Sequence, residues 1–403
     1  MGGIEPRGIA SIEFILQWKS SLAKHTDCYY ARRINFWRDL FSEKFLEAFL
    51  GKDEGEQVFL SGGVKEIVPL FRPENEFDLA LRHFDTHYEP SVARGPRFGR
   101  FYPKGILSGL PNIFRGNVEP FRCAGVDAVQ MRVDFNHPLS RMPVQLSAVI
   151  HSVDKKSGDI GGSCTDWIEV VSNGPGMQAR CKGEPTDFFS DNPLRRADEN
   201  DDAVFYSAPR LVTHTDDEAL VTIRGVYGRF LKNGMSVLDL MSSWRSHIPE
   251  GIALQSLMGL GLNREEMEGN EQLSDFVIHD LNRDPRLPFL SHTFDLVICT
   301  VSVEYLTQPF LVFEEVARVL VPGGMFIVTF SNRWFPPKTI RLWAQLHEFE
   351  RVGLVLEYFL RSGEFADIST YSLRGRLRPF DDRYFAETQL SDPVYAVWGS
   401  TRA

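Results

Sequence analysis

Hydrophobic and polar positions change their period along the second half of the chain. From residue 203 to the end, amphipathic segments such as TDDEALVTIRGVYGRFL and PFLVFEEVARVL alternate with short apolar runs such as SVLDL, FDLVICT and GGMFIVTF. Apolar residues three and four positions apart predict helices, and short apolar runs predict buried strands. The alternation predicts an α/β domain over residues 203–403, in which helices cover both faces of a parallel sheet.

The first part of the chain has a different pattern. The stretch FWRDLFSEKFLEAFL carries Phe41, Phe45 and Phe49 on one helical face, and Gly51 can end that helix. GEQVFLSG, VDAVQMRVDF and VQLSAVIHSV are typical of strands. We therefore expect a small α+β domain over residues 36–153. Residues 1–35 are predicted to be a helical extension, because IASIEFILQWKSSLA has apolar residues at helical spacing.

Residues 154–202 differ in composition from both neighbours. They are rich in Gly, Ser, Asp and Pro, as in DKKSGDIGGS and ADENDD, and only DWIEVV is typical of a strand. This composition predicts a connector between two domains. Two domains also suit the length, since 403 residues exceed what one ordinary core accommodates.

Charge and cysteine usage narrow the class of protein. The formal net charge is -10, whereas nucleic-acid binding relies on clustered Lys and Arg, so we expect no nucleic-acid partner. The five cysteines lie far apart without a CxxC pair, which predicts neither a disulfide framework nor a metal site. The N-terminus does not have the pattern of a signal peptide, and no apolar run has the ~18 residues of a membrane span. These features predict a cytoplasmic protein without membrane contact.

Candidate ligand-binding residues follow the predicted strands, because doubly wound sheets bind ligands beyond the carboxyl ends of their strands. The strand SVLDL is followed by the turn MSSW, and VIHDLN ends another strand with Asp280. FDLVICT runs into VSVEYL, and VPGG precedes a further strand. An Asp followed by a turn is also found in other Rossmann-like domains, including NAD-binding ones, so a single such motif leaves the ligand open.

The order of these motifs resembles the class I S-adenosylmethionine-dependent methyltransferases, most closely the type 11 group. The resemblance rests on Leu287-Pro288-Phe289, Phe294-Asp295 and Pro322-Gly323-Gly324, and covers about the last 200 residues. It implies a Rossmann-like sheet of seven strands, with LVLEYFLRSGEF as last helix and DPVYAVWGS as terminal strand. It also implies S-adenosylmethionine as cofactor and a methyl acceptor as substrate.

Two positions depart from this family. The family has glycines in the first turn, where this chain has Met241, Ser242, Ser243 and Trp244 after Asp239. The family also ends its second strand with an acid that holds the ribose, where this chain has Gly261. The small polar side chains of the turn can replace glycine backbone, and Asn263 is the nearby polar candidate for the ribose. The resemblance thus implies cofactor contacts from Asp239, Met241, Ser242, Ser243, Trp244, Asn263, Asp280, Leu281, Asn282 and Thr300.

The acceptor is expected above the fourth and fifth strands. Candidate substrate-binding residues there are Ser302, Tyr305, Asn332, Arg333 and Trp334. Candidate catalytic residues are Glu304, His214 and His247, since methyl transfer to a protonated acceptor requires a base. Each has an alternative role: Glu304 can cap or pair on the following helix, and the histidines can cap or pack. The segment RWFPPKTIRLWAQLHEF is predicted to be an extra helix that covers a small pocket, which favours a small-molecule acceptor.

The N-terminal part is similar to a second family. DFNHPL followed by an alternating strand, together with FLEAFLGKDEGEQV, resembles FKBP-type prolyl isomerases of the SlyD kind over residues 36–153. The strands that this family has before the helix are not recognisable in residues 1–35, so we expect a degenerate domain that serves as a scaffold or binds a protein partner. The rival to a methyltransferase is accordingly a folding helper or interaction protein that binds S-adenosylmethionine only weakly.

Overall fold

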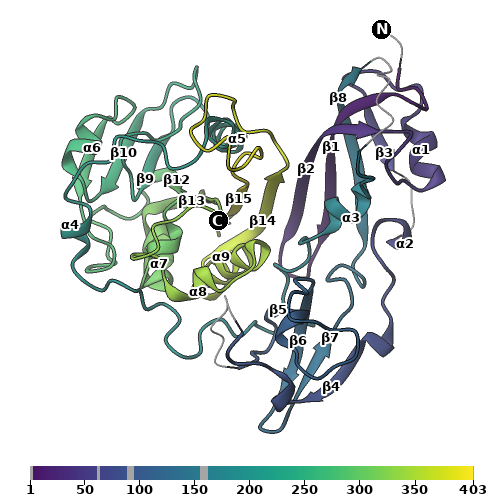
Figure 1. Ribbon diagram of the computed structural model, residues 1–403. Helices are drawn as coiled ribbons and strands as arrows, with labels where there is room; N and C mark the ends of the chain where they lie inside the picture. The colour runs from purple at the N-terminus through teal and green to yellow at the C-terminus, as the bar shows by residue number, and fades with distance from the viewer. Residues whose placement is uncertain (1–2, 61–63, 89–94, 155–161, 403) are drawn as a thin grey trace. The chain divides into compact units, whose positions relative to one another are not determined.

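The computed structural model describes residues 3–60, 64–88, 95–154 and 162–402 (Figure 1). The chain divides into two compact units, which are described separately. The first comprises Met1–Ser21, Ala31–Pro193 and Leu342–Leu354, and the second comprises Leu22–Tyr30, Leu194–Arg341 and Val355–Ala403. Within the described ranges, every helix is too short or too polar to cross a bilayer.

The first unit is built mainly from β-strands. Its strands are β1 (Ile9–Lys19), the end of β2 (Lys24–Asn35), β3 (Gln57–Leu60), β4 (Glu76–Ala80), β5 (Phe101–Pro103), β6 (Pro120–Val126), β7 (Gln130–Asp134) and β8 (Val144–Asp154). Its helices are α1 (Glu43–Phe49), α2 (Val64–Ile67) and α3 (Trp167–Ser172). Strand β8 pairs antiparallel with β1 and β3, while β4, β7, β6 and β5 form a separate sheet. Phe45 and Phe49 of α1 are buried, and Phe49 packs edge-on against Phe14 of β1.

The helical extension predicted for residues 1–35 is wrong, because this segment forms the strands β1 and β2. Ala10, Ile12, Phe14, Leu16 and Trp18 of β1 are all buried, an alternation typical of a strand. Ile12 and Leu16 also have helical spacing, which explains the error.

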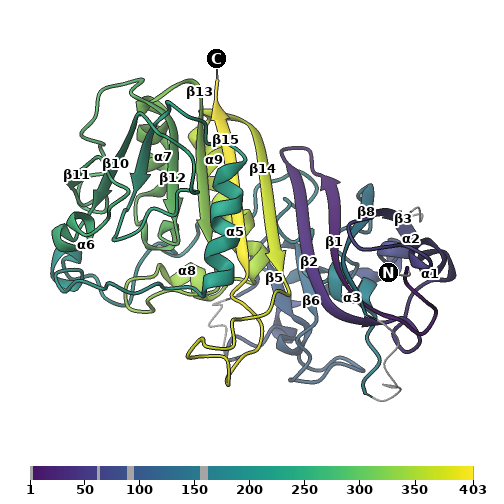
Figure 2. The same cartoon turned by 90° about the horizontal axis from the view of Figure 1, so that it is seen from above.

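The second unit contains an open sheet in the order β11-β10-β9-β12-β13-β15-β14 (Figure 2). Its strands are β9 (Ser236–Leu240), β10 (Ser256–Gly261), β11 (Asp275–Ile278), β12 (Phe294–Thr300), β13 (Leu320–Phe330), β14 (Phe365–Arg374) and β15 (Val394–Thr401). Strands β9 to β13 are parallel, and β15 runs antiparallel between β13 and β14. The first residues of β2 add a further strand that is parallel to β14, so this sheet extends beyond the seven strands expected.

Helices cover both faces of this sheet, as the alternation predicts. The helices of the second unit are α4 (Asp202–Phe205), α5 (Asp217–Gly228), α6 (Arg264–Glu268), α7 (Pro309–Val319) and the C-terminal part of α9 (Glu348–Ser362). All but the first residue of α8 (Arg341–Ala344), and the start of α9, belong to the first unit. Helix α5 lies on one face, while α7 and the C-terminal part of α9 lie on the other (Figures 1 and 2). Residues 241–255, between the parallel strands β9 and β10, contain no helix, although such crossovers are usually helical.

Two further expectations differ from the structure. DWIEVV was predicted as a strand but begins helix α3, because Asp166 caps the amides of Ile168 and Glu169. The residues of the predicted connector 154–202 divide between the two units: the first continues to Pro193, and the next stretch of the second begins at Leu194. Residues 155–161 of the connector lie outside the described residues. The single long helix expected for RWFPPKTIRLWAQLHEF is wrong as well, since that stretch contains only the short α8 before α9 begins.

Candidate functional site

A cavity of about 1210 Å³, measured up to its open mouth, lies at the carboxyl ends of β9 to β12 in the second unit. Parallel strands bring residues that are distant in sequence to this one edge. All the predicted cofactor-binding residues line it: Asp239, Met241, Ser242, Ser243, Trp244, Asn263, Asp280, Leu281, Asn282 and Thr300.

Asp239, the last residue but one of β9, carries the only carboxylate that this strand contributes to the cavity. The residue is 2% exposed, and Ser242 Oγ donates a hydrogen bond of 2.7 Å to its carboxylate. Burial raises the pKa of Asp239 to about 6, and bonds from Ser246 and Ser242 partly oppose this rise. A carboxyl with such a pKa is mostly ionised at pH 7 and becomes protonated as the pH falls through about 6.

The turn after β9 replaces the family's glycines without changing its backbone type. Met241 has φ of 59°, the left-handed conformation that favours glycine, at the place of the first glycine. The next amide, from Ser242, donates to the carbonyl of Leu260 on β10 at 2.7 Å, which fixes the turn against the neighbouring strand. The tight turn is therefore retained although the glycine is missing.

Met241→Gly is expected to stabilise the protein by about 1 kcal/mol, because a left-handed residue with a Cβ is strained by about that amount or more. Thermal denaturation of the two proteins would measure this difference. Met235 is equally half-buried and lacks a positive φ, so Met235→Gly is the matched control and should be destabilising. Equal losses for both glycine variants would contradict strain at Met241.

Position 261 requires glycine because the backbone of the turn after β9 approaches it closely. A Cβ at this position would lie 2.3 Å from the carbonyl oxygen of Ser242, well inside van der Waals contact. The aspartate or glutamate that the family has here is therefore sterically excluded in this chain. Gly261 and Met241 are thus two consequences of one backbone contact.

Asn263 lines the cavity but its side chain is committed to the backbone. Its oxygen accepts from the amide of Glu266 at 3.0 Å and caps α6, while its nitrogen donates to the carbonyl of Tyr206 at 2.8 Å. These bonds use the groups that the sequence analysis had assigned to the ribose. In the structure Asn263 therefore caps α6.

Glu266 is a carboxylate that the sequence analysis missed. It lies in the first turn of α6, lines the cavity and is 8% exposed. One oxygen accepts from Ser243 Oγ at 2.6 Å and the other from the amide of Arg210 at 2.6 Å. The segment REEME offers three acids, and only the orientation of α6, set by its cap at Asn263, distinguishes Glu266.

Trp244 and Ser243 complete the turn from the side of the mouth. The indole N–H of Trp244 donates to the carbonyl of Val212 at 3.1 Å, which ties the turn to the segment before α5. Arg245 lies over the Trp244 ring at 4.2 Å. Trp244 therefore forms part of the wall beside the mouth rather than a free lid.

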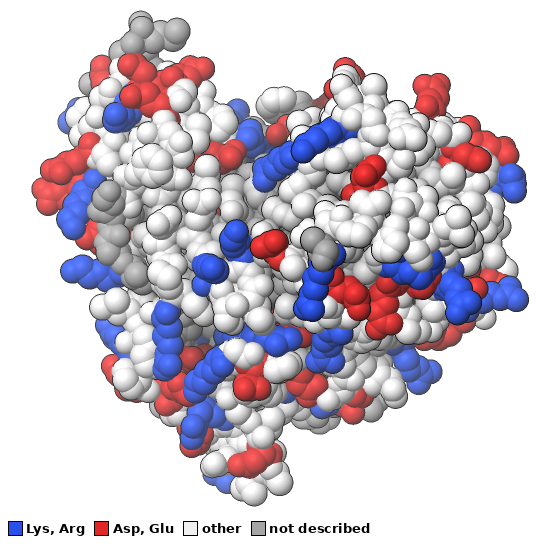
Figure 3. Space-filling model, turned by 180° about the vertical axis from the view of Figure 1, so that it is seen from behind, with Lys and Arg blue, Asp and Glu red and all other residues white. Residues whose placement is uncertain are grey.

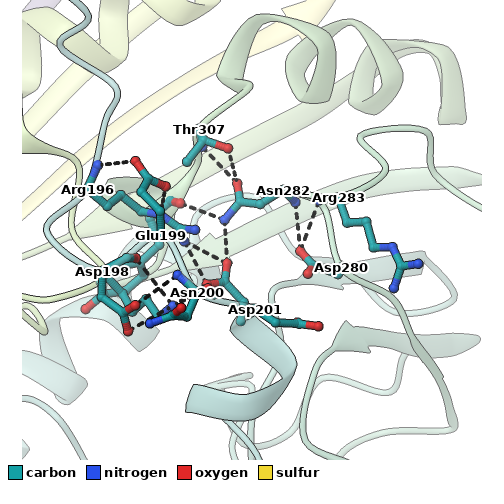
Figure 4. A network of polar contacts seen from close by, with 12 residues as sticks. Arg196, Asp198, Glu199, Asn200, Asp201, Asp280, Asn282, Arg283 and Thr307 are labelled. Atoms are coloured by element: carbon teal, nitrogen blue, oxygen red, sulfur yellow. Dashed lines mark hydrogen bonds and ion pairs between the residues drawn. The ribbon is translucent and has the colours of Figure 1, made fainter.

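A buried ionic network supports the loop after β11 (Figure 4). Asn282 donates to Asp202 and to the carbonyl of Tyr305, each at 2.9 Å, and its oxygen accepts from the amide of Thr307. Both carboxylate oxygens of Asp202 accept hydrogen bonds from Arg196, and Asp202 also forms an ion pair with the fully buried Lys338. Asn282 is therefore a structural residue that positions its neighbours, and Asp202, predicted to lie in a connector, lines the cavity.

Asp280 and Leu281 occupy the same loop with freer side chains. One oxygen of Asp280 accepts from the amides of Asn282 and Arg283 at 2.9 and 3.3 Å (Figure 4). Leu281 is buried against the cavity. The loop thus presents a carboxylate edge beside an apolar surface, which suits a heteroaromatic ring with an exocyclic amino group.

Two of the residues predicted on the acceptor side lie at this cavity. Ser302 and Tyr305 line the cavity, as does Phe335 after β13. The ring of Tyr305 stacks on that of Phe335 with centroids 6.1 Å apart, and its hydroxyl accepts from the amide of Phe335 at 2.8 Å. Thr300 shares a hydrogen bond of 2.6 Å with Tyr227 on α5. These contacts fix the shape of the cavity beyond β12.

Both candidate histidines line the cavity. His214 meets the ring of Phe335 edge-on at 4.9 Å, and desolvation lowers its pKa. His247 has φ of 58°, and burial lowers its pKa to about 4. Both rings are therefore neutral at pH 7, the state in which imidazole accepts a proton.

Four other candidates do not lie in this cavity. The side chain of Glu304 is enclosed, with no exposed surface, and it does not line the cavity. Asn332 is exposed, and Trp334 does not line the cavity either. Arg333 pairs with Asp392 at 2.9 Å and lines a second, adjacent hollow instead. None of these four residues lines the main cavity.

Comparison with known proteins identifies the domain that carries this site. Residues 258–328 match the family model described as a methyltransferase domain. The chain thus carries a methyltransferase domain, and S-adenosylmethionine is its cofactor. None of the curated protein sequences matches the chain. Among the described residues, no group of three or more His, Cys, Asp and Glu is arranged to hold a metal ion.

Solved structures with similarity to the chain include three bacterial proteins. The YcgJ protein of Bacillus subtilis is 15% identical, with a TM-score of 0.33 and coverage of 46% of this chain and 99% of its own. An S-adenosylmethionine-dependent methyltransferase from Mesorhizobium loti is 16% identical, with a TM-score of 0.27; the match covers 42% of this chain and 91% of that protein. Another S-adenosylmethionine-dependent methyltransferase, from Thermotoga maritima, is 12% identical, with a TM-score of 0.34; the match covers 45% of this chain and 89% of that protein. At these scores we take neither substrate nor partner from them.

The matched family model includes no residue of 36–153. The resemblance of that segment to SlyD-like FKBP domains, and a protein partner for it, stay predictions. The expected cytoplasmic location stays a prediction as well.

Proposed function

We propose that the protein transfers a methyl group from S-adenosylmethionine to a small-molecule acceptor in the cavity of the second unit. The observation that carries this proposal is the convergence of the turn after β9, the loop after β11 and the end of β12 on a single cavity. The acceptor side, with Tyr305 and Phe335, opens into the same space. Donor and acceptor can therefore be bound next to each other, which is what in-line transfer requires.

The residues of the cavity fit the parts of S-adenosylmethionine. Asp239 offers a carboxylate to a cationic group, and Asp280 with Leu281 suits the adenine. Glu266, close to the end of β10, takes the place of the missing ribose acid, since a carboxylate binds a diol well. When bound, this cofactor supplies a methyl group activated by the adjacent sulfonium.

The remaining chemistry falls to the acceptor side. Tyr305 and Phe335 orient the acceptor, and Trp244 with the segment before α5 excludes water. His214, which is neutral at pH 7 and lies against Phe335, is the residue that we assign as base for an acceptor that carries a proton. His247 lines the same cavity, but its pKa of about 4 makes it the weaker base.

A small acceptor is supported by the charge of the molecule. Lys and Arg are interspersed with Asp and Glu over the face that Figure 3 presents. The net charge is -10. A nucleic-acid acceptor would require a clustered basic surface.

Calorimetric titration with S-adenosylmethionine, S-adenosylhomocysteine and NAD tests the site, and transfer of labelled methyl groups to small metabolites tests the activity. Micromolar binding of the two sulfur compounds without NAD binding, followed by labelling of a small acceptor, is the expected result. Binding of NAD alone would reject the proposal. Labelling only of nucleic acid or of protein would reject the small-molecule acceptor.

The affinity for S-adenosylmethionine is expected to rise with pH between pH 5 and 7. The folded-state pKa of Asp239 is raised to about 6, so below that pH a proton must leave before the carboxylate meets the cationic cofactor. The dissociation constant should fall roughly tenfold per pH unit below pH 6 and become constant above it. Titrations at pH 5, 6 and 7 measure this, and Asp239→Asn should bind weakly without this dependence. The same slope in the asparagine variant would assign the dependence to another group.

A further inference from the structure

Arg210 lines the cavity, and no carboxylate among the described residues neutralises its guanidinium. Within the described chain, no Asp or Glu forms an ion pair with its side chain, and Nη1 is buried without a hydrogen-bond partner. Nη2 donates to the carbonyl of Phe205 at 3.0 Å. Glu266 contacts only the backbone amide of Arg210.

Aromatic rings surround this guanidinium. Its central carbon lies 4.6 Å from the ring centroid of Phe205, 5.3 Å from that of Phe335 and 5.4 Å from that of Tyr206. Cation–π contacts with these rings offset part of the desolvation of the charged group. They leave a donor group unused, although an unsatisfied buried donor is destabilising.

The location of Arg210 distinguishes between the two ligands of the cavity. Phe335 follows β13 and stacks on Tyr305, which follows β12. His214, the proposed base, touches the same Phe335 ring. Arg210 therefore belongs to the acceptor side, whereas the amino-acid part of the cofactor is expected at the turn after β9.

We propose that the acceptor is a small carboxylic acid with a planar, aromatic body, and that Arg210 binds its carboxylate. The guanidinium fork matches a carboxylate in two parallel hydrogen bonds. The flat surfaces of Tyr305 and Phe335 suit the planar body. This inference rests on the proposed methyltransferase function and adds the chemical class of the substrate.

The test is calorimetric titration of the full chain with benzoate, 4-hydroxybenzoate, 3,4-dihydroxybenzoate, 4-coumarate and indole-3-acetate, each in the presence of saturating S-adenosylhomocysteine. At least one acid is expected to bind, and its methyl ester at least tenfold more weakly. Arg210→Gln should lose at least tenfold in affinity for the acid and little for the ester. Arg210→Lys keeps the charge but not the two-pronged hydrogen bonding of the guanidinium, so its affinity for the acid should lie between those of the wild type and of Arg210→Gln.

Arg264→Gln is the matched control, since Arg264 also lies over a ring, that of Phe276, but on an exposed part of α6. It should leave both affinities unchanged. Failure of the wild type to bind S-adenosylhomocysteine would reject the proposed function itself. Binding of S-adenosylhomocysteine but of none of the acids would overturn only this inference.

A loss in Arg210→Gln of affinity for S-adenosylhomocysteine, without a loss for 5′-methylthioadenosine, which has no carboxylate, would also overturn it. Arg210 would then bind the cofactor's carboxylate instead of the acceptor's. Thermal denaturation of each variant shows whether the chain is folded, and Arg210→Lys provides the comparison if Arg210→Gln does not fold.

Discussion

Gly261→Ala is expected to lose about 3 kcal/mol of folding free energy and at least about tenfold in affinity for S-adenosylmethionine. The added Cβ would meet the carbonyl oxygen of Ser242 at 2.3 Å, and backbone cannot move aside as a flexible side chain can. Relief would require the turn after β9 to shift, which breaks the bond from the Ser242 amide to Leu260. Thermal or urea denaturation and cofactor titration measure the two losses.

Gly269→Ala is the matched control for this substitution. A Cβ at Gly269 would lie no closer than 3.4 Å to its neighbours, and its φ of −78° suits any residue. We expect a change within about 0.5 kcal/mol and unchanged binding. If Gly261→Ala behaved like this control, the contact between the turn and β10 would not determine the cofactor site.

Asp202→Asn is the second substitution with a large expected effect, a loss of about 3 kcal/mol or more in folding free energy. Asp202 is 4% exposed and receives Arg196, Asn282 and the fully buried Lys338. Burial alone would raise its pKa, but these partners lower it, so its charge is needed at neutral pH. Removal of the charge leaves two cations short of an anion, and Asn282 loses a partner that positions the loop after β11.

The control for Asp202→Asn is Glu268→Gln, which removes one partner of the exposed pair between Arg264 and Glu268 and should change stability by less than about 1 kcal/mol. Combining Asp202→Asn with Lys338→Met should recover part of the loss, because the unpaired cation is removed too. A loss below about 1 kcal/mol for Asp202→Asn alone would mean that Asp198, the other partner of Lys338, is sufficient.

The hydrophobic pattern predicted most of the second unit, because parallel strands are continuous apolar runs whose ends necessarily meet. The pattern placed Asp239 and Asp280 at strand ends and the resemblance to methyltransferases added Thr300, and all three line one cavity. Nothing in the pattern could reveal that β2, near the start of the chain, pairs with β14, because strand pairing over hundreds of residues has no local signal.

The errors at the site have local physical causes. Glu304 follows β12, but the short 3-10 helix Val303–Tyr305 directs its side chain inward, where it is fully enclosed. Arg333 was expected to meet the acceptor, but Asp392, 59 residues later, binds it. Arg210 and Glu266 were missed because neither belongs to a motif, and only the packing of α6 and of the segment before α5 brings them to the cavity.

The crossover between β9 and β10 is the part of the site that ligand binding is expected to order most. Without a helix, residues 241–255 have few backbone bonds: the amides of Ser242 and Gln255 donate to backbone carbonyls, and those of Ile248 and Ala253 to side chains. Segments of this kind open locally at a lower free energy than the strands beside them. Ligand binding therefore has to order this segment, and slower amide hydrogen exchange between Met241 and Gln255 becomes a direct signal that the cavity is filled.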